Sequence, residues 1–152
     1  MKKWLVCVFS VLLSGCVTLL MQQENYWALT SNVLEKMNQA YMAKNFQDFS
    51  SYVAPETVFN RDDFLTAVQN DFAGFVTVEY ETKIRDLRFF KNEGQINQTV
   101  EVLVEFSRSA FTYRYGTSLE MGETLLTFEM TPQKQFFLKD MGTPLLYGLV
   151  AP

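Results

Sequence analysis

The spacing of apolar residues changes halfway along this 152-residue chain, and that change limits the folds it can adopt. Before Gly74, apolar side chains recur every three or four residues, which predicts helices with one buried face. From Val76 onward they alternate with other residues, which predicts strands with one buried face. Helices followed by strands indicate an α+β domain.

Three helices are predicted in the first half. The first covers residues 25–43, with an apolar stripe of Tyr26, Trp27, Val33, Leu34, Met37, Ala40 and Tyr41. Asn45 is expected to cap a short second helix. Asn60 or Asp62 is expected to cap a third helix, which Gly74 ends. The apolar face of this third helix contains Phe64, Leu65, Val68 and Phe72.

The second half predicts about four antiparallel strands. The first strand alternates through Val76, Val78, Tyr80, Thr82 and Ile84. Its phase slips at Arg85 and Asp86, which predicts a β-bulge. Further alternating runs follow at residues 100–106, 111–115 and 126–130, before a last strand at 135–140. We therefore expect three N-terminal helices packed on a curved antiparallel sheet, in one α+β domain over residues 25–140.

The order of these elements over residues 28–140 resembles the nuclear transport factor 2-like superfamily, also called cystatin-like. The likeness rests on the long first helix, the helix junction at residues 43–49, the Val58-Phe59 segment and the helix at residues 60–72. Members often carry Trp in the last strand, where this chain has Phe136 and Phe137. The resemblance implies a cone-shaped domain whose sheet curls around a pocket open at one end.

Aromatic residues are the candidate lining of that pocket: Tyr41, Tyr80, Phe106, Tyr113 and Phe128, with Tyr115 as a further candidate. The alternative is that these rings fill an ordinary core, because aromatic stripes at strand spacing usually pack. Some members of the resembled superfamily isomerise steroids with an Asp base and a Tyr donor. Here Asp86 falls at the bulge and Asp140 at a strand end, so no catalytic residue is assigned.

The N-terminus carries a second resemblance. An apolar run from Trp4 follows Lys2 and Lys3, and the run ends in Leu13-Ser14-Gly15-Cys16. This motif resembles the lipobox of bacterial lipoprotein signals. The resemblance implies that residues 1–15 are a signal peptide, that Cys16 takes a diacylglyceryl group, and that residues 16–24 are an acylated N-terminus and short tether.

The alternative for this region is a signal anchor that stays in the membrane as a helix through residues 4–21. In the lipoprotein case Val17, by resemblance to enterobacterial sorting, favours the outer membrane, facing the periplasm, if the organism has one. Lipid then provides the membrane attachment. The apolar tail at residues 141–152 is expected to pack on the domain or on a partner.

The residue inventory argues against several kinds of chemistry. The chain has no His, and its two Cys are Cys7, inside the expected signal, and Cys16. Nucleophilic triads, His-ligated zinc and thiolate chemistry are therefore not expected. No Gly-rich phosphate loop occurs, and we expect no metal and no cofactor. The net charge of −4 becomes more negative when Lys2 and Lys3 are removed, which argues against nucleic acid as a partner.

Three functional hypotheses follow. The leading one is a non-catalytic, lipid-anchored envelope module that binds an envelope protein or forms a homodimer. The alternative is a binder of a small apolar ligand in the cone-shaped pocket. The third is an isomerase or dehydratase, which requires a carboxylate deep in the cone. An enzyme is the least favoured because the inventory offers so few catalytic groups.

Overall fold

A computed structural model describes residues 25–91 and 93–149. The chain divides into two units between residues 32 and 33. In the first unit residues 25–32 are helical, and the Thr30 hydroxyl donates to the Tyr26 carbonyl at 2.8 Å. The predicted lipobox and its Cys16 lie outside the described residues. Within residues 25–91 and 93–149, no helix combines the length and apolar character needed to cross a bilayer.

The helices begin where the sequence places their caps. The first helix continues to residue 42, and α2 (Phe46–Ser51) follows after Asn45, whose side chain accepts a hydrogen bond from the Asp48 N–H at 3.2 Å. The longer α3 (Arg61–Gly74) begins after Asn60, whose side-chain oxygen accepts from two N–H groups of the first turn. These caps satisfy amide groups that have no partner inside the helix.

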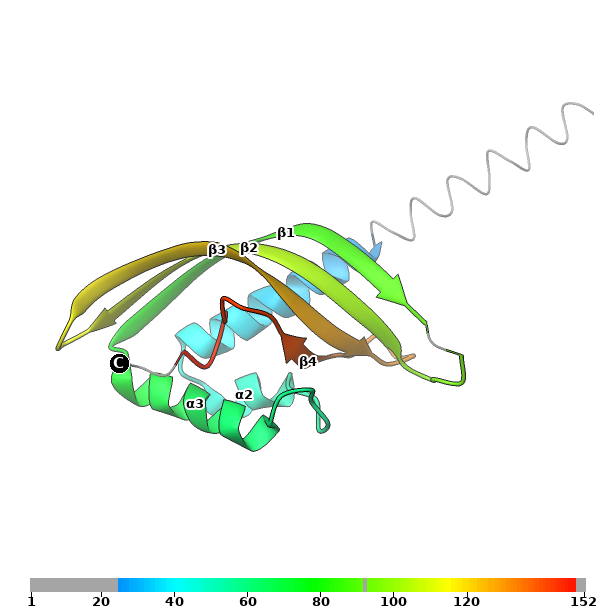
Figure 1. Ribbon diagram of the computed structural model, residues 1–152, viewed down its shortest axis with the longest axis horizontal. Coiled ribbons are helices and arrows are strands. Elements are labelled where there is room, and N and C mark those ends of the chain that lie inside the picture. The colour runs from blue at the N-terminus through cyan, green and yellow to red at the C-terminus, as the bar shows by residue number, and fades with distance from the viewer. Residues whose placement is uncertain (1–24, 92, 150–152) are drawn as a thin grey trace, which may run out of the picture. The chain divides into compact units, whose positions relative to one another are not determined.

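Four strands form one antiparallel sheet in the order β1-β2-β3-β4. Their bounds are β1 Thr77–Phe90, β2 Gln98–Thr112, β3 Gly116–Met130 and β4 Phe136–Met141. The register of β1 against β2 shifts between Ile84 and Asp86, which confirms the predicted bulge. In Figure 1 the sheet arches over α2 and α3. The α+β fold expected from the sequence, with helices on one face of a curved antiparallel sheet, is therefore confirmed.

The separate strand predicted at residues 111–115 is wrong. Strand β2 runs unbroken to Thr112, and residues 113–115 are the turn into β3. The buried positions of β2 continue past Phe106 in the same phase through Arg108, Ala110 and Thr112. The alternation of apolar residues does not extend to Thr112 in the sequence, because the charged residue Arg108 stands at one of these inward positions.

The outer edge of β4 is covered by the segment that follows α2. Leu138 exchanges two backbone hydrogen bonds with this segment, from its N–H to the Tyr52 carbonyl and from the Ala54 N–H to its own carbonyl. The Val58 N–H donates to the Lys139 carbonyl at 2.9 Å. The other edge strand is β1, which carries the bulge.

The core lies between the inner face of the sheet and the helices. Its fully buried side chains include Met37, Phe49, Val68, Val100, Val102, Val104, Leu126 and Leu138. After β4 the chain turns back beneath the sheet, drawn in red in Figure 1. There Leu146 and Tyr147 are also fully buried. Within residues 145–149, called the C-terminal segment below, residues 146–148 are therefore buried inside the domain.

Candidate functional site

The interior of the cone is occupied by the C-terminal segment. The Tyr147 ring packs against three other aromatic rings, with centroid distances of 5.2 Å to Tyr41, 5.0 Å to Phe49 and 5.8 Å to Tyr80. These rings come from the first helix, α2 and β1. Tyr147 therefore lies where the elements of the cone converge.

The Tyr147 hydroxyl is held by a polar residue of the first helix. It donates to Asn38 Oδ1 at 2.7 Å, and Asn38 Nδ2 donates to the Thr82 hydroxyl of β1 at 2.9 Å. Asn38 is only 5% exposed although it carries an amide. The amide is tolerated in the core because both of its ends are hydrogen-bonded.

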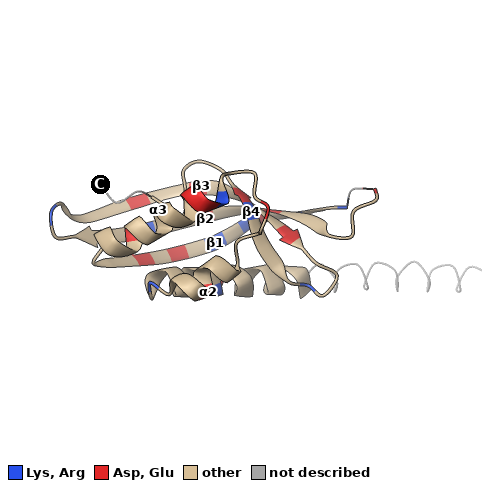
Figure 2. Ribbon diagram, turned by 90° about the horizontal axis from the view of Figure 1, so that it is seen from below, with Lys and Arg blue, Asp and Glu red and all other residues tan. Residues whose placement is uncertain are grey.

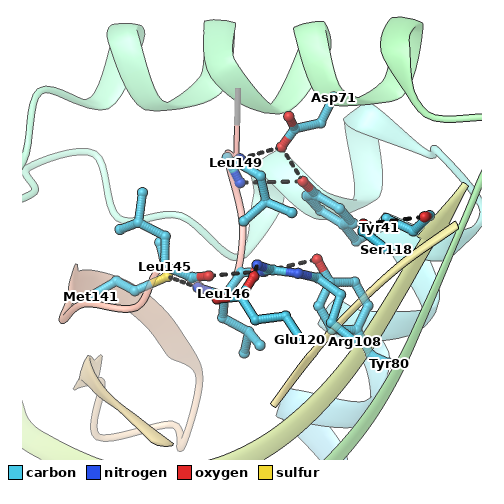
Figure 3. A network of polar contacts seen from close by, with 12 residues as sticks. Tyr41, Asp71, Tyr80, Arg108, Ser118, Glu120, Met141, Leu145, Leu146 and Leu149 are labelled. Carbon is cyan, nitrogen blue, oxygen red and sulfur yellow. Dashed lines mark hydrogen bonds and ion pairs between the residues drawn. The ribbon is translucent and has the colours of Figure 1, made fainter. Parts of the chain in front are cut away.

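A carboxylate also lies in the interior. Asp71 of α3 is fully buried, and its Oδ2 accepts hydrogen bonds from the Tyr41 hydroxyl and from the Leu149 N–H (Figure 3). The Gly148 N–H donates to the Tyr41 oxygen at 3.2 Å. Tyr41 and Asp71 therefore form a pair that also accepts hydrogen bonds from two amide groups of the C-terminal segment.

On the opposite side, Arg108 of β2 holds the carbonyl groups of the same segment. Its Nη1 donates to the Leu145 oxygen at 2.8 Å and to the Leu146 oxygen at 3.2 Å, while its Nη2 forms an ion pair with Glu120 of β3. The Tyr80 hydroxyl adds a hydrogen bond to the Leu146 oxygen at 2.8 Å. Among the described residues, no buried side-chain nitrogen or oxygen lacks a partner.

Burial keeps the tyrosines of this network protonated. It raises the pKa of Tyr41 far above its usual value, and the neighbouring Tyr80 and Asp71 raise that pKa further. The pKa of Tyr80 is also raised by burial, although Arg108 opposes the effect. The pKa of the Tyr147 hydroxyl is raised mainly by burial as well. All three hydroxyls therefore act as hydrogen-bond donors at neutral pH.

The structure brings together only part of the predicted pocket lining. Tyr41 and Tyr80 are in edge contact at 5.6 Å, and Phe106 is buried beneath Arg108, with 5.5 Å between guanidinium and ring centroid. Phe128 is buried elsewhere, against Phe136 of β4. Tyr113 is 88% exposed, so the prediction that it lines the pocket is wrong. The reason is that β2 ends one residue earlier and places it in the turn.

Three interior polar residues, Asn38, Asp71 and Arg108, are absent from the sequence prediction. A usable signal exists for Asp71, which lies three residues after Val68 and seven after Phe64, on the apolar stripe of α3. Arg108 similarly falls in phase with the apolar positions of β2. A charged residue in phase with a buried stripe is therefore the pattern that would have located this site.

No cluster of three or more potential metal ligands is found in the described part of the chain. Asp71 Oδ2 and the guanidinium of Arg108 are hydrogen-bonded to other groups of the chain. This arrangement can bind a peptide main chain, because Arg108 donates to carbonyl groups and Asp71 accepts from an N–H group.

The outer face of the sheet has a different character. Leu119, Met121 and Leu125 project from β3 on this face and are 68%, 74% and 42% exposed. A hollow of about 630 Å³ crosses the middle of three strands, lined by Glu81, Thr82, Lys83, Glu105, Phe106, Ser107, Met121, Gly122 and Glu123. Acidic residues recur along the strands (Figure 2). The hollow is thus lined by apolar residues and by charged residues, three of the four charged ones being acidic.

No family model matches the sequence, and no curated protein is similar to it. Solved structures do match. A conserved protein from Planctomyces limnophilus has a TM-score of 0.65 at 12% identity, covering 78% of this chain and 94% of that chain. A protein from Kribbella flavida has a TM-score of 0.60 at 12% identity, covering 85% and 98%.

A third match is a protein of the NTF2-like (nuclear transport factor 2-like) family from Streptomyces avermitilis, described as a candidate dehydratase. Its TM-score is 0.52 at 11% identity, covering 78% of this chain and 95% of that one. Identities this low carry information about shape and not about activity. The chain has the cone-shaped α+β fold of the NTF2-like proteins.

Proposed function

We propose that this chain is a non-catalytic protein-interaction module, held at a bacterial envelope by lipid on Cys16, which binds its partner through the outer face of the sheet. The proposal rests on the observation that the chain itself fills the interior of the cone. Leu146 and Tyr147 fill the interior, and the interior polar groups are hydrogen-bonded to the chain itself. The outer face leaves Leu119 and Met121 exposed beside a hollow.

The occupied interior counts against the two alternatives. A small apolar ligand requires the volume that Leu146 and Tyr147 take up. An isomerase or dehydratase requires a carboxylate that reaches substrate. Asp71 is a carboxylate inside the cone, but its Oδ2 already accepts from Tyr41 and Leu149. An envelope protein or a second copy of the chain is therefore the favoured partner.

Site-specific photo-crosslinking in the native envelope tests this function. We expect a crosslinkable residue in place of Met121 to give a discrete adduct, because this exposed side chain lies at the hollow. The matched control is the same residue in place of Gln69, an exposed position of α3. Equal adducts at both positions, or none at either, would contradict a partner at the outer face. The adduct mass distinguishes a second copy from another protein.

The anchor has a separate test. Intact-mass measurement of the protein purified from membranes should show the chain starting at Cys16 with a diacylglyceryl group. Cys16→Ser is expected to abolish the diacylglyceryl modification and the cleavage before residue 16, because lipid attachment needs the thiol. A chain that retains residues 1–15 and an unmodified sulfur would contradict the lipid anchor. It would not contradict partner binding at the outer face of the sheet.

A further inference from the structure

The C-terminal segment is held as a peptide ligand is held. Within the described part of the chain, residues 143–149 form no hydrogen bond to another backbone group. Their backbone carbonyl and N–H groups are instead bound by side chains from the body of the domain: Tyr41, Asp71, Tyr80, Arg108 and Met141. Side chains from separate elements of the domain thus bind the main chain of one segment.

The segment also carries specificity features. Tyr147 inserts its ring among aromatic rings and ends on the amide of Asn38. The next residue, Gly148, has φ +68, and a Cβ added there would lie 3.0 Å from the Phe64 ring. A side chain at that position is therefore disfavoured by backbone conformation and by space. The cavity thus selects an aromatic hydroxyl followed by glycine.

We propose that residues 145–149 are an intramolecular ligand, and that the cavity they fill is a binding site for a Leu-Tyr-Gly peptide segment supplied in trans, bent as it is here. In this view Arg108 and Tyr80 bind the carbonyl groups of the segment, and Asp71 binds an N–H group beyond the glycine. The site lies inside the cone, so it is separate from the outer face and stands whether or not that face binds a partner.

The test uses the full chain with a protease site inserted between Gly142 and Thr143, a position before the segment where Thr143 is exposed. After cleavage, the body is mixed with a fluorescein-labelled synthetic peptide of residues 143–149. We expect the labelled peptide to exchange into the cavity and raise its fluorescence anisotropy. A peptide carrying Tyr147→Ala is expected to compete on the order of 100-fold more weakly, because a buried aromatic ring is lost.

Two results would overturn the proposal. The first is a body that keeps its cooperative urea transition after cleavage but does not bind the labelled peptide. The second is a body that unfolds on cleavage, which would make the segment an ordinary part of the core. A peptide carrying Gly148→Ala is the matched control for specificity, and binding equal to that of the unaltered peptide would remove the claim that glycine is selected.

If the inserted protease site prevents folding, hydrogen exchange on the unaltered chain tests whether the C-terminal segment can leave the cavity. The Gly148 and Leu149 amides are bound only by Tyr41 and Asp71 in the described part of the chain. We expect them to exchange through a local opening while the Val102 amide of β2 stays protected. If the Gly148 and Leu149 amides had the same opening free energy as the Val102 amide, the segment would leave only when the whole domain unfolds, and the proposal would be wrong.

Discussion

The hydrogen bond between Tyr147 and Asn38 gives the sharpest test of how the cone is held together. Tyr147→Phe removes one oxygen and leaves the ring contacts in place. Asn38 Oδ1 then loses its donor, although Asn38 Nδ2 still donates to Thr82. A buried acceptor left without a partner costs about 1–3 kcal/mol. We therefore expect the free energy of unfolding to fall by that amount.

Urea unfolding followed by circular dichroism is the assay. With a slope of about 1.5 kcal/mol/M, the midpoint should fall by roughly 0.7–2 M with no change in slope. The matched control is Tyr113→Phe, which removes a hydroxyl from a side chain that is 88% exposed. A surface change of this kind is expected to stay within about 0.5 kcal/mol.

A double-mutant cycle then assigns the loss to this bond. Asn38→Ala removes the acceptor, so adding Tyr147→Phe to that variant should cost less than Tyr147→Phe alone, by about 1 kcal/mol. The reasoning is refuted if Tyr147→Phe leaves the midpoint unchanged. It is equally refuted if the two substitutions are strictly additive, because the hydroxyl and the amide would then act independently.

Three further predictions concern other parts of the domain. Asn60→Ala should lower the free energy of unfolding by about 1 kcal/mol, since the first-turn amides of α3 lose their acceptor; Asn60→Asp, which can still cap, should restore most of it in the same urea assay. Gly148→Ala should cost about 2 kcal/mol or more from its left-handed conformation and the approach to Phe64, and a neutral result by thermal denaturation would contradict the close packing there. Above about pH 10 the domain should lose stability, because burial raises the pKa of three tyrosines: Tyr41, Tyr80 and Tyr147. Their raised pKa contributes stability fully below the unfolded value near 10, and this contribution is lost as the pH rises above that value. The tyrosinate absorbance of these three among the seven tyrosines should therefore appear together with the loss of near-ultraviolet circular dichroism. Ionisation of all seven tyrosines in a chain that stays folded would contradict the burial of these three.

The local features of the fold were predictable because their causes are local. Asn45 and Asn60 cap helices through side-chain contacts within three residues, and the slip at Arg85 and Asp86 is visible in a single strand. The first half of β3 was not predictable, because its pattern is inverted. There Leu119 and Met121 face outward and are exposed, while polar side chains take the inward positions.

The interior site was only partly predictable, because it is assembled by long-range contacts. Tyr41 and Tyr80 were candidates as aromatic residues in apolar stripes. The contact between Asp71 and Leu149 joins residues 78 positions apart, and that between Asn38 and Tyr147 joins residues 109 apart. Whether a buried Asp or Asn has a partner depends on such contacts, and periodicity alone does not contain them.

The two edge strands of the sheet, β1 and β4, differ in how they are protected against pairing with a strand of another molecule. A long regular margin presents a row of main-chain donors and acceptors to which a foreign strand can add, and such addition leads to aggregation. The β4 margin is already bonded to residues 52–58. The β1 margin is irregular at its bulge and carries Glu79, Glu81, Lys83 and Arg85. Strand addition is therefore disfavoured at β4 and at the bulge of β1. If copies of this domain do pair through strands, the first half of β3, which β4 does not reach, is the margin expected to accept a strand.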